Sequence, residues 1–292
     1  MATPEMPGRA RIYVGTSGWS YPKGEGTWTG HFYPSGKINE LEYYSLFFNT
    51  VEINSSFYRP PDPGYVHNWV RRVPEGFLFT VKLWQKFTHP RMYEEATGDR
   101  AVISQQDVDQ FSHSLEPLVK SGKLGALLAQ FPPSFKNGGY GQQILNAVIS
   151  AFGRYRLTVE LRHRSWSDDE NTARLLRENN VSWAHIDEPK FQSSVASEVP
   201  RTSDMSYFRF HGRNKETWWT GDRETRYKYL YSSEEIDELA GKVTIAAEKA
   251  NLTFVLFNNH WQGYAPRNAV SMMKALQLPF RDFPEQIPPA EE

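Results

Sequence analysis

The chain of 292 residues contains no cysteine. That absence excludes disulfide bridges, thiolate zinc sites, iron–sulfur clusters held by cysteine and a cysteine nucleophile. It is typical of a reducing compartment, and the first residues lack the apolar segment of a secretory signal, so we expect the protein to be cytoplasmic. No run approaches the roughly 18 consecutive apolar residues of a transmembrane helix, and no membrane is expected as a partner.

An excess of one charge sign is also lacking, because 33 Lys and Arg are balanced by 34 Asp and Glu, for a formal net charge of -1. No global field therefore attracts nucleic acid or an anionic membrane, although a local basic patch would be enough to bind a strand. Nucleic acid is thus a partner that the net charge does not support. Any ligand must be recognised at a local site.

The chain has no internal linker either. Between residues 11 and 283 there is no Pro/Gly/Ser-rich stretch, block of like charge or shift in composition. Hydrophobic residues make up 39% of the chain and aromatic residues 14%, which is enough apolar surface for a sizeable core. We expect one domain over residues 11–283, a flexible N-terminus (1–10) and a loose C-terminal tail (284–292).

Eight short apolar or alternating segments recur about 34 residues apart, and that spacing is the length of one βα unit. The predicted strands are 11–17, 50–55, 78–82, 126–130, 156–162, 181–187, 206–211 and 253–258. The predicted helices are 38–48, 63–73, 105–120, 142–152, 169–179, 233–249 and 265–276. Only residues 188–205 have little helix signal. The pattern predicts an α/β fold, a single (βα)8 TIM barrel with eight parallel strands and surrounding helices.

A doubly wound open sheet is the alternative architecture. Such a sheet normally carries a Gly-rich phosphate-binding turn after its first strand. The segment Gly15-Thr-Ser-Gly18 follows neither the dinucleotide nor the P-loop spacing. The barrel is therefore the preferred prediction.

Polar residues alternate with apolar ones on several predicted strands. Side chains two residues apart share a face of a strand, and in a barrel one face meets the helices while the other fills the interior. If the apolar residues meet the helices, the inward side chains are Glu52, Asn54, Thr80, Lys82, Glu160, Arg162, His185, Asp187, Arg209 and His211. Gln130 ends the fourth strand, and Asn258 or Asn259 lies near the rim after the last one.

These inward charges allow two interpretations. In the first, the acids Glu52, Glu160 and Asp187 neutralise the neighbouring basic residues in a structural network. In the second, the charges form a functional site, because they fall at the carboxyl ends of the strands, where barrel enzymes carry their catalytic groups. We favour the site.

Two features of the loops indicate an anionic, ring-containing ligand. Arg213, Lys215 and Arg267 would form a phosphate cradle with the start of the last helix, or would be ordinary solvated charges. The tryptophans that follow predicted strands are Trp19, Trp28, Trp84, Trp166, Trp218, Trp219 and Trp261. Their rings would stack on a ligand at the mouth, or would pack the loops over the barrel. The expected partner is an anionic small molecule or a nucleotide-like ligand.

Eight ordered motifs run along nearly the whole chain. They are Gly15–Tyr21, Trp28–Pro34, Asn49–Tyr58, Phe79–Lys82 with Thr88-His89, Leu127–Phe135, Val159–His163 with Ser165-Trp166, Tyr207–Arg213 and Phe257–His260. Together they resemble the YecE-like family, the domain of unknown function numbered seventy-two. The resemblance implies a TIM-barrel fold and no established activity. Its motif positions coincide with most of the inward residues and add His163.

The preferred hypothesis is an enzyme, a hydrolase or lyase, that needs no metal or other cofactor. The catalytic candidates are Glu52, Lys82, Glu160 and His211. The substrate-binding candidates are Asn54, Gln130, Arg162, His163, Asp187, Arg209, Arg213, Asn258, Trp19, Trp166 and Trp261. Lys82 would stabilise negative charge, or act as a nucleophile if its pKa fell. A lysine paired with Glu160 would stay protonated, so a Schiff base is conceivable but not the expected chemistry.

Three alternatives remain open. The ligands of a metal-dependent hydrolase or isomerase would be Glu52, Glu160, Asp187, His185 and His211, although fixed positive charges nearby oppose a divalent cation. A glycosidase would use Glu52 and Glu160 as its carboxylate pair. A non-catalytic module would bind nucleic acid or another ligand through Arg213, Lys215 and the rim tryptophans.

Overall fold

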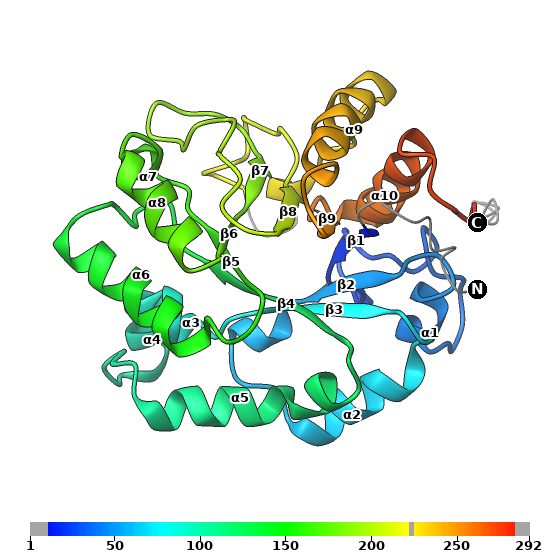
Figure 1. The fold of residues 1–292 in the computed structure, drawn as a ribbon. Coiled ribbons are helices and arrows are strands. Elements are labelled where there is room, and N and C mark those ends of the chain that lie inside the picture. The colour runs from blue at the N-terminus through cyan, green and yellow to red at the C-terminus, as the bar shows by residue number, and fades with distance from the viewer. Residues whose placement is uncertain (1–10, 222–224, 284–292) are drawn as a thin grey trace.

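The described strands all run parallel and belong to one sheet, in a computed structural model that describes residues 11–221 and 225–283. The strands are β1 (Arg11–Ser17), β2 (Thr50–Ile53), β3 (Leu78–Lys82), β4 (Leu124–Gln130), β5 (Leu157–Glu160), β6 (Ser182–Trp183), β7 (His185–Asp187), β8 (Met205–Phe210) and β9 (Leu252–Phe257). Hydrogen bonds join them in the order β6-β5-β4-β3-β2-β1-β9-β8-β7. The sheet curls until its two ends approach each other (Figure 1). The predicted α/β barrel class is confirmed.

The two ends of the sheet are consecutive in sequence, because β6 and β7 are the two halves of the expected sixth strand. They separate at Ala184, where pairing changes from β6 with β5 to β7 with β8. Next to this seam (residues 182–187), Ser182 Oγ donates to Met205 O, and the Thr202 hydroxyl donates to Val181 O and accepts from Trp183 N. Side-chain hydroxyls thus replace ladder hydrogen bonds, and the sheet has nine strands where eight were predicted.

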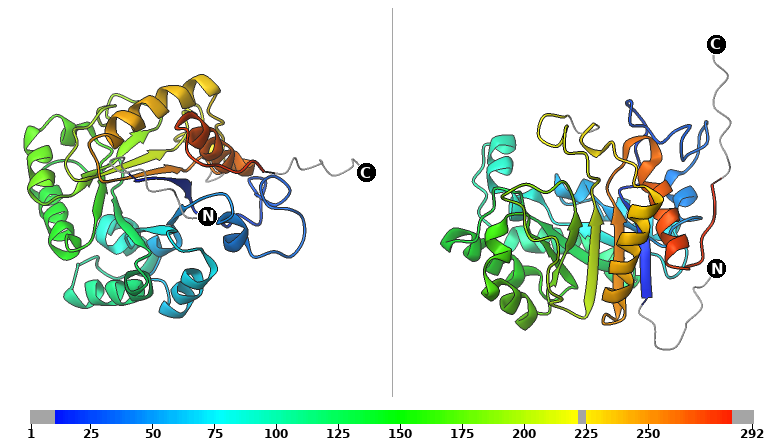
Figure 2. Two further views of the ribbon diagram at one scale, coloured as in Figure 1. Left: turned by 45° about the vertical axis from the view of Figure 1, so that its right-hand side comes forward. Right: turned by 90° about the horizontal axis from the view of Figure 1, so that it is seen from above.

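Helices cover the outside of the barrel (Figure 2). They are α1 (Glu40–Tyr44), α2 (Pro63–Arg72), α3 (Gln85–Thr88), α4 (Pro90–Thr97), α5 (Gln105–Lys120), α6 (Gly139–Phe152), α7 (Arg164–Ser167), α8 (Glu170–Glu178), α9 (Ser233–Ala247) and α10 (Tyr264–Ala275). The seven predicted helices are present, and the short α3, α4 and α7 are additional. No helix lies between β7 and β8, as predicted for residues 188–205. The expected flexible N-terminus (1–10) and loose tail (284–292) lie outside the described residues.

Local sequence explains where the longer helices begin. Ser104 and Ser232 form capping boxes with Asp107 and Glu235, so the free N–H groups of the first turns of α5 and α9 find acceptors. Asp62 accepts from two backbone N–H groups at the start of α2, which has proline at its first position. No helix in the two described ranges is long and apolar enough to cross a membrane.

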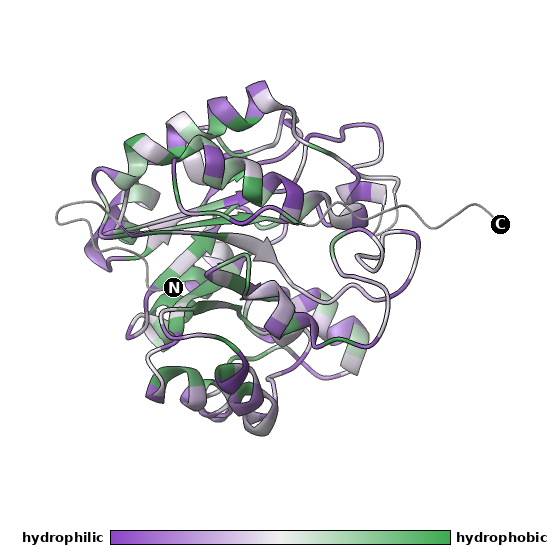
Figure 3. Ribbon diagram, turned by 90° about the vertical axis from the view of Figure 1, so that its right-hand side faces the viewer, coloured by the Kyte–Doolittle hydropathy of each residue, from purple (hydrophilic) through white to green (hydrophobic). Residues whose placement is uncertain are grey.

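The barrel interior changes from apolar to polar along the strands. The rings of Tyr13 and Tyr207 lie 5.5 and 5.8 Å from that of Phe254, and a Cβ at Gly125 would lie 2.6 Å from the same ring. Glycine at that position therefore leaves the space that Phe254 fills. Hydrophobic residues line the strands and the helix faces toward them, while hydrophilic residues cover the outer surface (Figure 3). The charged interior residues lie nearer the carboxyl ends of the strands; on β8, for example, Arg209 comes two residues after Tyr207.

Candidate functional site

A buried arginine joins two buried glutamates inside the barrel. Arg209 on β8 places Nη2 2.6 Å from Glu52 Oε1 on β2 and Nη1 2.5 Å from Glu160 Oε2 on β5. Its Nε donates to the second oxygen of Glu52 at 3.1 Å. The Tyr207 hydroxyl also donates to Glu52 Oε2 at 2.8 Å and lies 2.9 Å from Thr80 Oγ1. Glu52, Glu160 and Arg209 therefore point into the barrel and form one cluster, with the arginine between the two glutamates.

Arg162 extends the cluster beyond the end of β5. Its guanidinium lies 2.6 Å from Glu160 Oε1, and its Nη1 lies 3.1 Å from Glu188 Oε2. Burial would raise the pKa of Glu160, but the guanidinium groups of Arg162 and Arg209 outweigh that effect and hold the pKa well below its ordinary value. Glu160 is therefore a fixed anion, and it is poorly suited to donate a proton.

Glu188 was not among the predicted site residues. Burial raises its pKa, and nearby positive charges, with Arg162 foremost, only partly oppose the shift. The residue follows β7 directly, in the connection without a helix, where no alternation pattern exists to reveal it. In contrast to Glu160, its environment favours holding a proton.

Lys82 at the end of β3 differs from both arginines because it has no partner. In the described ranges no group accepts a hydrogen bond from its Nζ and no carboxylate lies within ion-pair distance, and the ammonium lies 4.0 Å from the centroid of the Phe57 ring. Burial, aided by the positive charge of Arg209, lowers its pKa to about 7. Glu52 and Glu160 oppose that shift without forming an ion pair with Lys82. The side chain is only half-buried, so it remains reachable from solvent.

His211 is placed as predicted, inside the barrel, but its charge state limits its role. Arg162 Nη2 and Asn258 Nδ2 lie 3.2 and 3.0 Å from its two ring nitrogens. Burial, with the nearby charge of Arg162, lowers its pKa to about 3. The imidazole is therefore neutral near pH 7, and it orients Arg162 rather than supplying a proton.

His89 is a second neutral histidine near the lysine, and it was quoted in the motifs without being chosen as a site residue. Its ring meets Phe57 edge-on at 4.9 Å and its Nδ1 lies 2.9 Å from Thr88 Oγ1. Burial, followed by the charge of Lys82, lowers its pKa to about 3. Because it follows a helix that the sequence did not predict, no strand periodicity pointed to it.

The amide candidates lie on the inner side as expected. Gln130 pairs in register with Glu160, and Asn54 follows β2 two residues after Glu52. Both are half-buried, and Asn54 Oδ1 is a buried oxygen without a hydrogen-bond partner in the described residues. Amide groups at the carboxyl ends of β2 and β4 are the kind of polar groups that orient a small ligand.

The sixth strand corrects one set of predictions. His185 is in register with Phe208 and stacks on it at 4.6 Å, and Asp187 is in register with Phe210. Since Arg209 points inward, these neighbours of it point outward, and the predicted inward direction of His185 and Asp187 is wrong. Ala184 and Ile186 fill the barrel instead, because a barrel interior accepts apolar residues as readily as the helix-facing side does.

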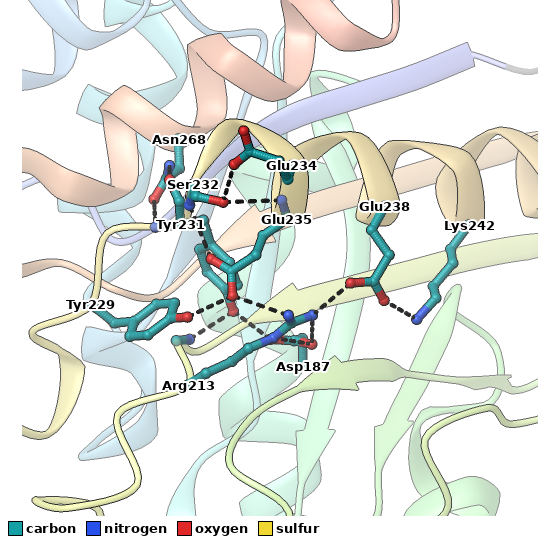
Figure 4. A network of polar contacts seen from close by, with 11 residues as sticks. Asp187, Arg213, Tyr229, Tyr231, Ser232, Glu234, Glu235, Glu238, Lys242 and Asn268 are labelled. Atoms are coloured by element: carbon teal, nitrogen blue, oxygen red, sulfur yellow. Dashed lines mark hydrogen bonds and ion pairs between the residues drawn. The ribbon is translucent and has the colours of Figure 1, made fainter.

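Arg213 is part of a separate network on the outside of the barrel (Figure 4). It binds Asp187 through Nε at 2.9 Å and Nη2 at 2.8 Å, and it reaches Glu235 and Glu238 on α9 at 3.1 and 3.5 Å. The Tyr231 hydroxyl donates to Asp187 at 2.7 Å. This outer network therefore ties β7 to α9, and the guanidinium that was expected to bind a phosphate is already neutralised.

The other predicted anion and loop residues are similarly dispersed. Lys215 and Arg267 are exposed. His163 caps α7, where its Nδ1 accepts from Ser165 N at 3.1 Å and lies 2.8 Å from Ser165 Oγ. These positions favour surface and capping roles, so the phosphate cradle at loops seven and eight has little support from the geometry.

The tryptophans mostly pack the loops, which was the second interpretation of their pattern. Trp166 is 1% exposed and stacks on Phe135, and Trp261 is 4% exposed. Trp19 meets Trp69 edge-on at 5.4 Å and lines a surface cavity of about 550 Å³ beside α1 and α2. None of the three candidate tryptophans contacts the charged cluster in the described residues.

One of the expected tryptophans, Trp218, and one tyrosine, Tyr227, lie beside His211, each with its ring centroid 6.4 Å away. Tyr227 also lies 5.2 Å from His260, and His260 stacks on Tyr21 at 4.6 Å. Tyr21 and Tyr227 are half-buried. Periodicity could not find Tyr21, Tyr227 or His260, because they belong to loops or a short 3₁₀ turn after strands.

The geometry weighs against two of the alternative chemistries. The proposed metal ligands do not converge: His185 and Asp187 lie on the outer face, Arg209 occupies the space between the two glutamates, and the described ranges contain no group of three acidic or histidine side chains that could hold a metal. A glycosidase needs a carboxyl group that donates a proton, whereas Glu160 is held ionised.

Known proteins resemble this chain over most of its length. A sequence model described as "Protein of unknown function DUF72" matches residues 13–292. The UPF0759 protein YunF of Bacillus subtilis (strain 168) is 31% identical over 293 residues, covering 94% of this chain and 99% of that protein. The UPF0759 protein YecE of Escherichia coli O157:H7 is 26% identical over 60% of this chain and 59% of that protein.

Solved structures of similar proteins share the fold. A DUF72 family protein from Thermotoga maritima MSB8 has a TM-score of 0.79 and 36% identity, over 91% of this chain and 99% of that one. A DUF72 family protein from Enterococcus faecalis V583 has a TM-score of 0.79 and 29% identity, over 95% and 100% of the two chains.

Proposed function

The chain belongs to the DUF72 family, and from its own geometry we propose that it is an enzyme acting on a phosphate-bearing or other anionic, ring-containing compound at the carboxyl ends of the barrel strands. One observation carries the proposal. Within the described part of the chain, Lys82 is a cation of the cluster without a carboxylate partner, whereas Arg162 and Arg209 are each held by two glutamates. A negatively charged ligand would supply the anionic partner that Lys82 lacks.

The roles of the charged residues follow from what each one contacts. Lys82 receives the anionic group or the negative charge that develops during reaction. Glu188 supplies a proton, because burial raises the pKa of its carboxyl group. Arg162 and Arg209 act as positioning residues that hold the glutamates, which revises their expected role as direct anion ligands.

The ring-binding part of the proposal depends on Tyr21, Tyr227 and His260. They lie on loops that follow β1, β8 and β9; Tyr227 is 6.4 Å from His211 and 5.2 Å from His260, which stacks on Tyr21. Aromatic faces bind flat ligands by stacking and tolerate different ring chemistries. A ring held there would bring an attached anionic group toward the polar interior.

Benzoate, phenyl phosphate and uncharged benzyl alcohol test the proposal by thermal shift and calorimetry. We expect the two anions to stabilise the protein and benzyl alcohol to have no comparable effect. Lys82→Met should weaken anion binding by about tenfold or more, the value of a charge-assisted contact. Lys86→Met is the matched control, because Lys86 is similarly buried but bound to Asp107 at 2.7 Å.

The pH dependence gives a second, independent readout. Benzoate keeps its charge between pH 6 and 8, while Lys82 loses its proton near pH 7. Benzoate should therefore bind more weakly as the pH rises through 7. Equal binding by the wild-type protein and Lys82→Met, at every pH, would remove the basis of the proposal.

A further inference from the structure

We propose that Lys82 is a covalent nucleophile that forms an imine with an aldehyde or ketone group of the substrate. The inference rests on the proposed function for the place of the reaction, but it adds a substrate class, carbonyl compounds, and a bond that a mere anion site would not form. The geometry points to it through the position of Lys82 at the carboxyl end of β3, the hydrogen bonds that the neighbouring carboxylates already accept, and the residues around its amine.

The position of Lys82 suits attack on a bound substrate. Its side chain projects inward from the carboxyl end of β3, where barrel enzymes place catalytic groups, and it is half-buried rather than sealed. The residue is therefore partly accessible to solvent while the rest of it is packed in the barrel.

The neighbouring carboxylates are unable to capture the ammonium. Both oxygens of Glu52 and both oxygens of Glu160 already accept from Arg209, Arg162 or Tyr207, at 2.5 to 3.1 Å. A lysine paired with Glu160 would have stayed protonated, and this was the reason for not expecting a Schiff base from sequence alone. The arginines remove that obstacle.

The remaining groups around Lys82 have opposing effects on its proton. The face of Phe57, 4.0 Å from the nitrogen, attracts the ammonium, whereas His89 is neutral and adds no negative charge that would hold the proton. The positive charges of Arg209 and Arg162 both lower the pKa of Lys82, although less than burial does. At pH 7 about half of a group with a pKa of about 7 is neutral, against less than about one in a thousand for a lysine near its reference value.

The proposed step balances as an ordinary condensation. The Nζ lone pair attacks the carbonyl carbon, the π pair of C=O moves to oxygen, and that oxygen gains a proton. Loss of a proton from nitrogen and of the protonated hydroxyl as water then gives the iminium ion. One carbonyl, one amine and one proton thus become one iminium and one water, with no oxidant or reductant. The iminium keeps the positive charge that faces an anionic substrate.

Glu188 is the group of the cluster that matches the proton requirement. Burial favours its protonated form, and the carboxyl is connected to the site through Arg162 at 3.1 Å. The proton that it supplies to the leaving oxygen returns from water in the hydrolysis of the iminium. Glu188 is here a positioning or proton-supplying residue, and Lys82 is the residue that bonds to substrate.

Reductive trapping tests the inference on the full chain. The protein is incubated at pH 7 with 4-formylbenzoate, or with uncharged benzaldehyde, and sodium cyanoborohydride, and labelled lysines are located by peptide mass spectrometry. We expect label on Lys82 at least about tenfold faster than on Lys86, because a pKa of about 7 leaves about half of Lys82 neutral, whereas the nitrogen of Lys86 is bound to Asp107 at 2.7 Å. The rate should rise with pH through about 7, opposite to the trend for benzoate binding.

Two variants keep the result interpretable. Lys82→Arg keeps a positive charge but forms no stable imine, so it should lose the label while retaining benzoate binding. Glu188→Gln should slow trapping at Lys82 without moving label to another lysine. Thermal unfolding of each variant shows that the fold is intact.

The outcomes separate the two proposals. Rapid labelling of Lys82 by both aldehydes supports the imine and removes the anion requirement. Labelling by 4-formylbenzoate with little from benzaldehyde supports both. Labelling of Lys82 no faster than Lys86 in the folded protein overturns the imine, and benzoate binding that depends on Lys82 then leaves the proposed function standing alone.

Discussion

Two arginine–carboxylate networks lie on opposite sides of the same wall of strands. In the inner one Arg209 is 1% exposed and both of its glutamates are fully buried. In the outer one the Arg213 side chain is 29% exposed, and its carboxylates are also partly in contact with water. The residue types are the same, and the difference is which face of a strand each side chain occupies.

That difference teaches what the inner network can do that the outer one cannot. Every charge of the outer network finds an opposite charge or water, so the network holds β7 and α9 together. In the inner network the glutamates are bound to the arginines, so among the described residues Lys82 has no carboxylate partner, and burial lowers its pKa to about 7. The pairing of the arginines with the glutamates thus leaves Lys82 as the reactive group.

Arg209→Met should break the comparison most strongly. Removing the guanidinium leaves Glu52 and Glu160 close together and buried without their common partner. We expect the free energy of unfolding to fall by about 3 to 5 kcal/mol, as for other broken buried pairs. Denaturant unfolding followed by circular dichroism measures it, and a loss below about 1 kcal/mol would show that the inner network does not support the fold.

Lys82→Met should change how stability depends on pH. The pKa of Lys82 is about 7 in the folded state against an ordinary value of 10.5, so between these values the unfolded chain binds more protons. The wild-type protein should therefore gain stability as pH rises from 7 toward 10.5, by up to about 1.4 kcal/mol per pH unit from this group. Lys82→Met should lack that gain and Lys86→Met should keep it. Parallel stability curves for all three proteins would contradict the shifted pKa.

Arg213→Met should cost much less than the inner change. Asp187 keeps the Tyr231 hydroxyl and partial access to water when the guanidinium is lost. We expect a loss of about 1 kcal/mol in denaturant unfolding, and no change in aldehyde trapping at Lys82. A loss as large as that of Arg209→Met would mean that exposure does not distinguish the two networks.

Glu238→Ala should be the mildest change. Its contact with Arg213 is 3.5 Å long, and its other ion pair, to Lys242, is also exposed. Surface pairs of this kind contribute little, so we expect a change within about 0.5 kcal/mol. Urea unfolding of Glu238→Ala and Arg213→Met, measured together, gives the smallest and the largest loss of unfolding free energy expected in the outer network.

Much of the inner cluster could be predicted from the sequence. The alternation on β2, β3, β5 and β8 placed Glu52, Lys82, Glu160 and Arg209 inward because each strand continues regularly in the sheet. The sixth strand failed because its alternate residues Ala184 and Ile186 fit either face. Periodicity says which residues share a face, but only contacts with neighbouring strands say which face is inside.

The rest of the site depends on partners rather than positions. No pattern in the sequence states that Glu160 binds two arginines and leaves the lysine free, since that choice is made by distances across the barrel. Glu188, His89 and Tyr227 lie in segments without strand periodicity, so they had no signal beyond their chemical type. Tryptophan position likewise could not distinguish a ring that faces a ligand from one that packs a loop.

The break at Ala184 gives the Arg209–Glu160 pair a mechanical meaning. Around most of the barrel the circumference is held by ladders, such as the six residue pairs between β1 and β9, but at the seam, among the described strands, β6 is hydrogen-bonded to β5 alone and β7 to β8 alone. Transient opening follows the path with the fewest hydrogen bonds, so amide hydrogen exchange in the sheet should be fastest there. Glu160 on β5 and Arg209 on β8 stand on the strands that flank this break. Their ion pair spans the break inside the barrel and so links β5 to β8 where the backbone ladder is interrupted.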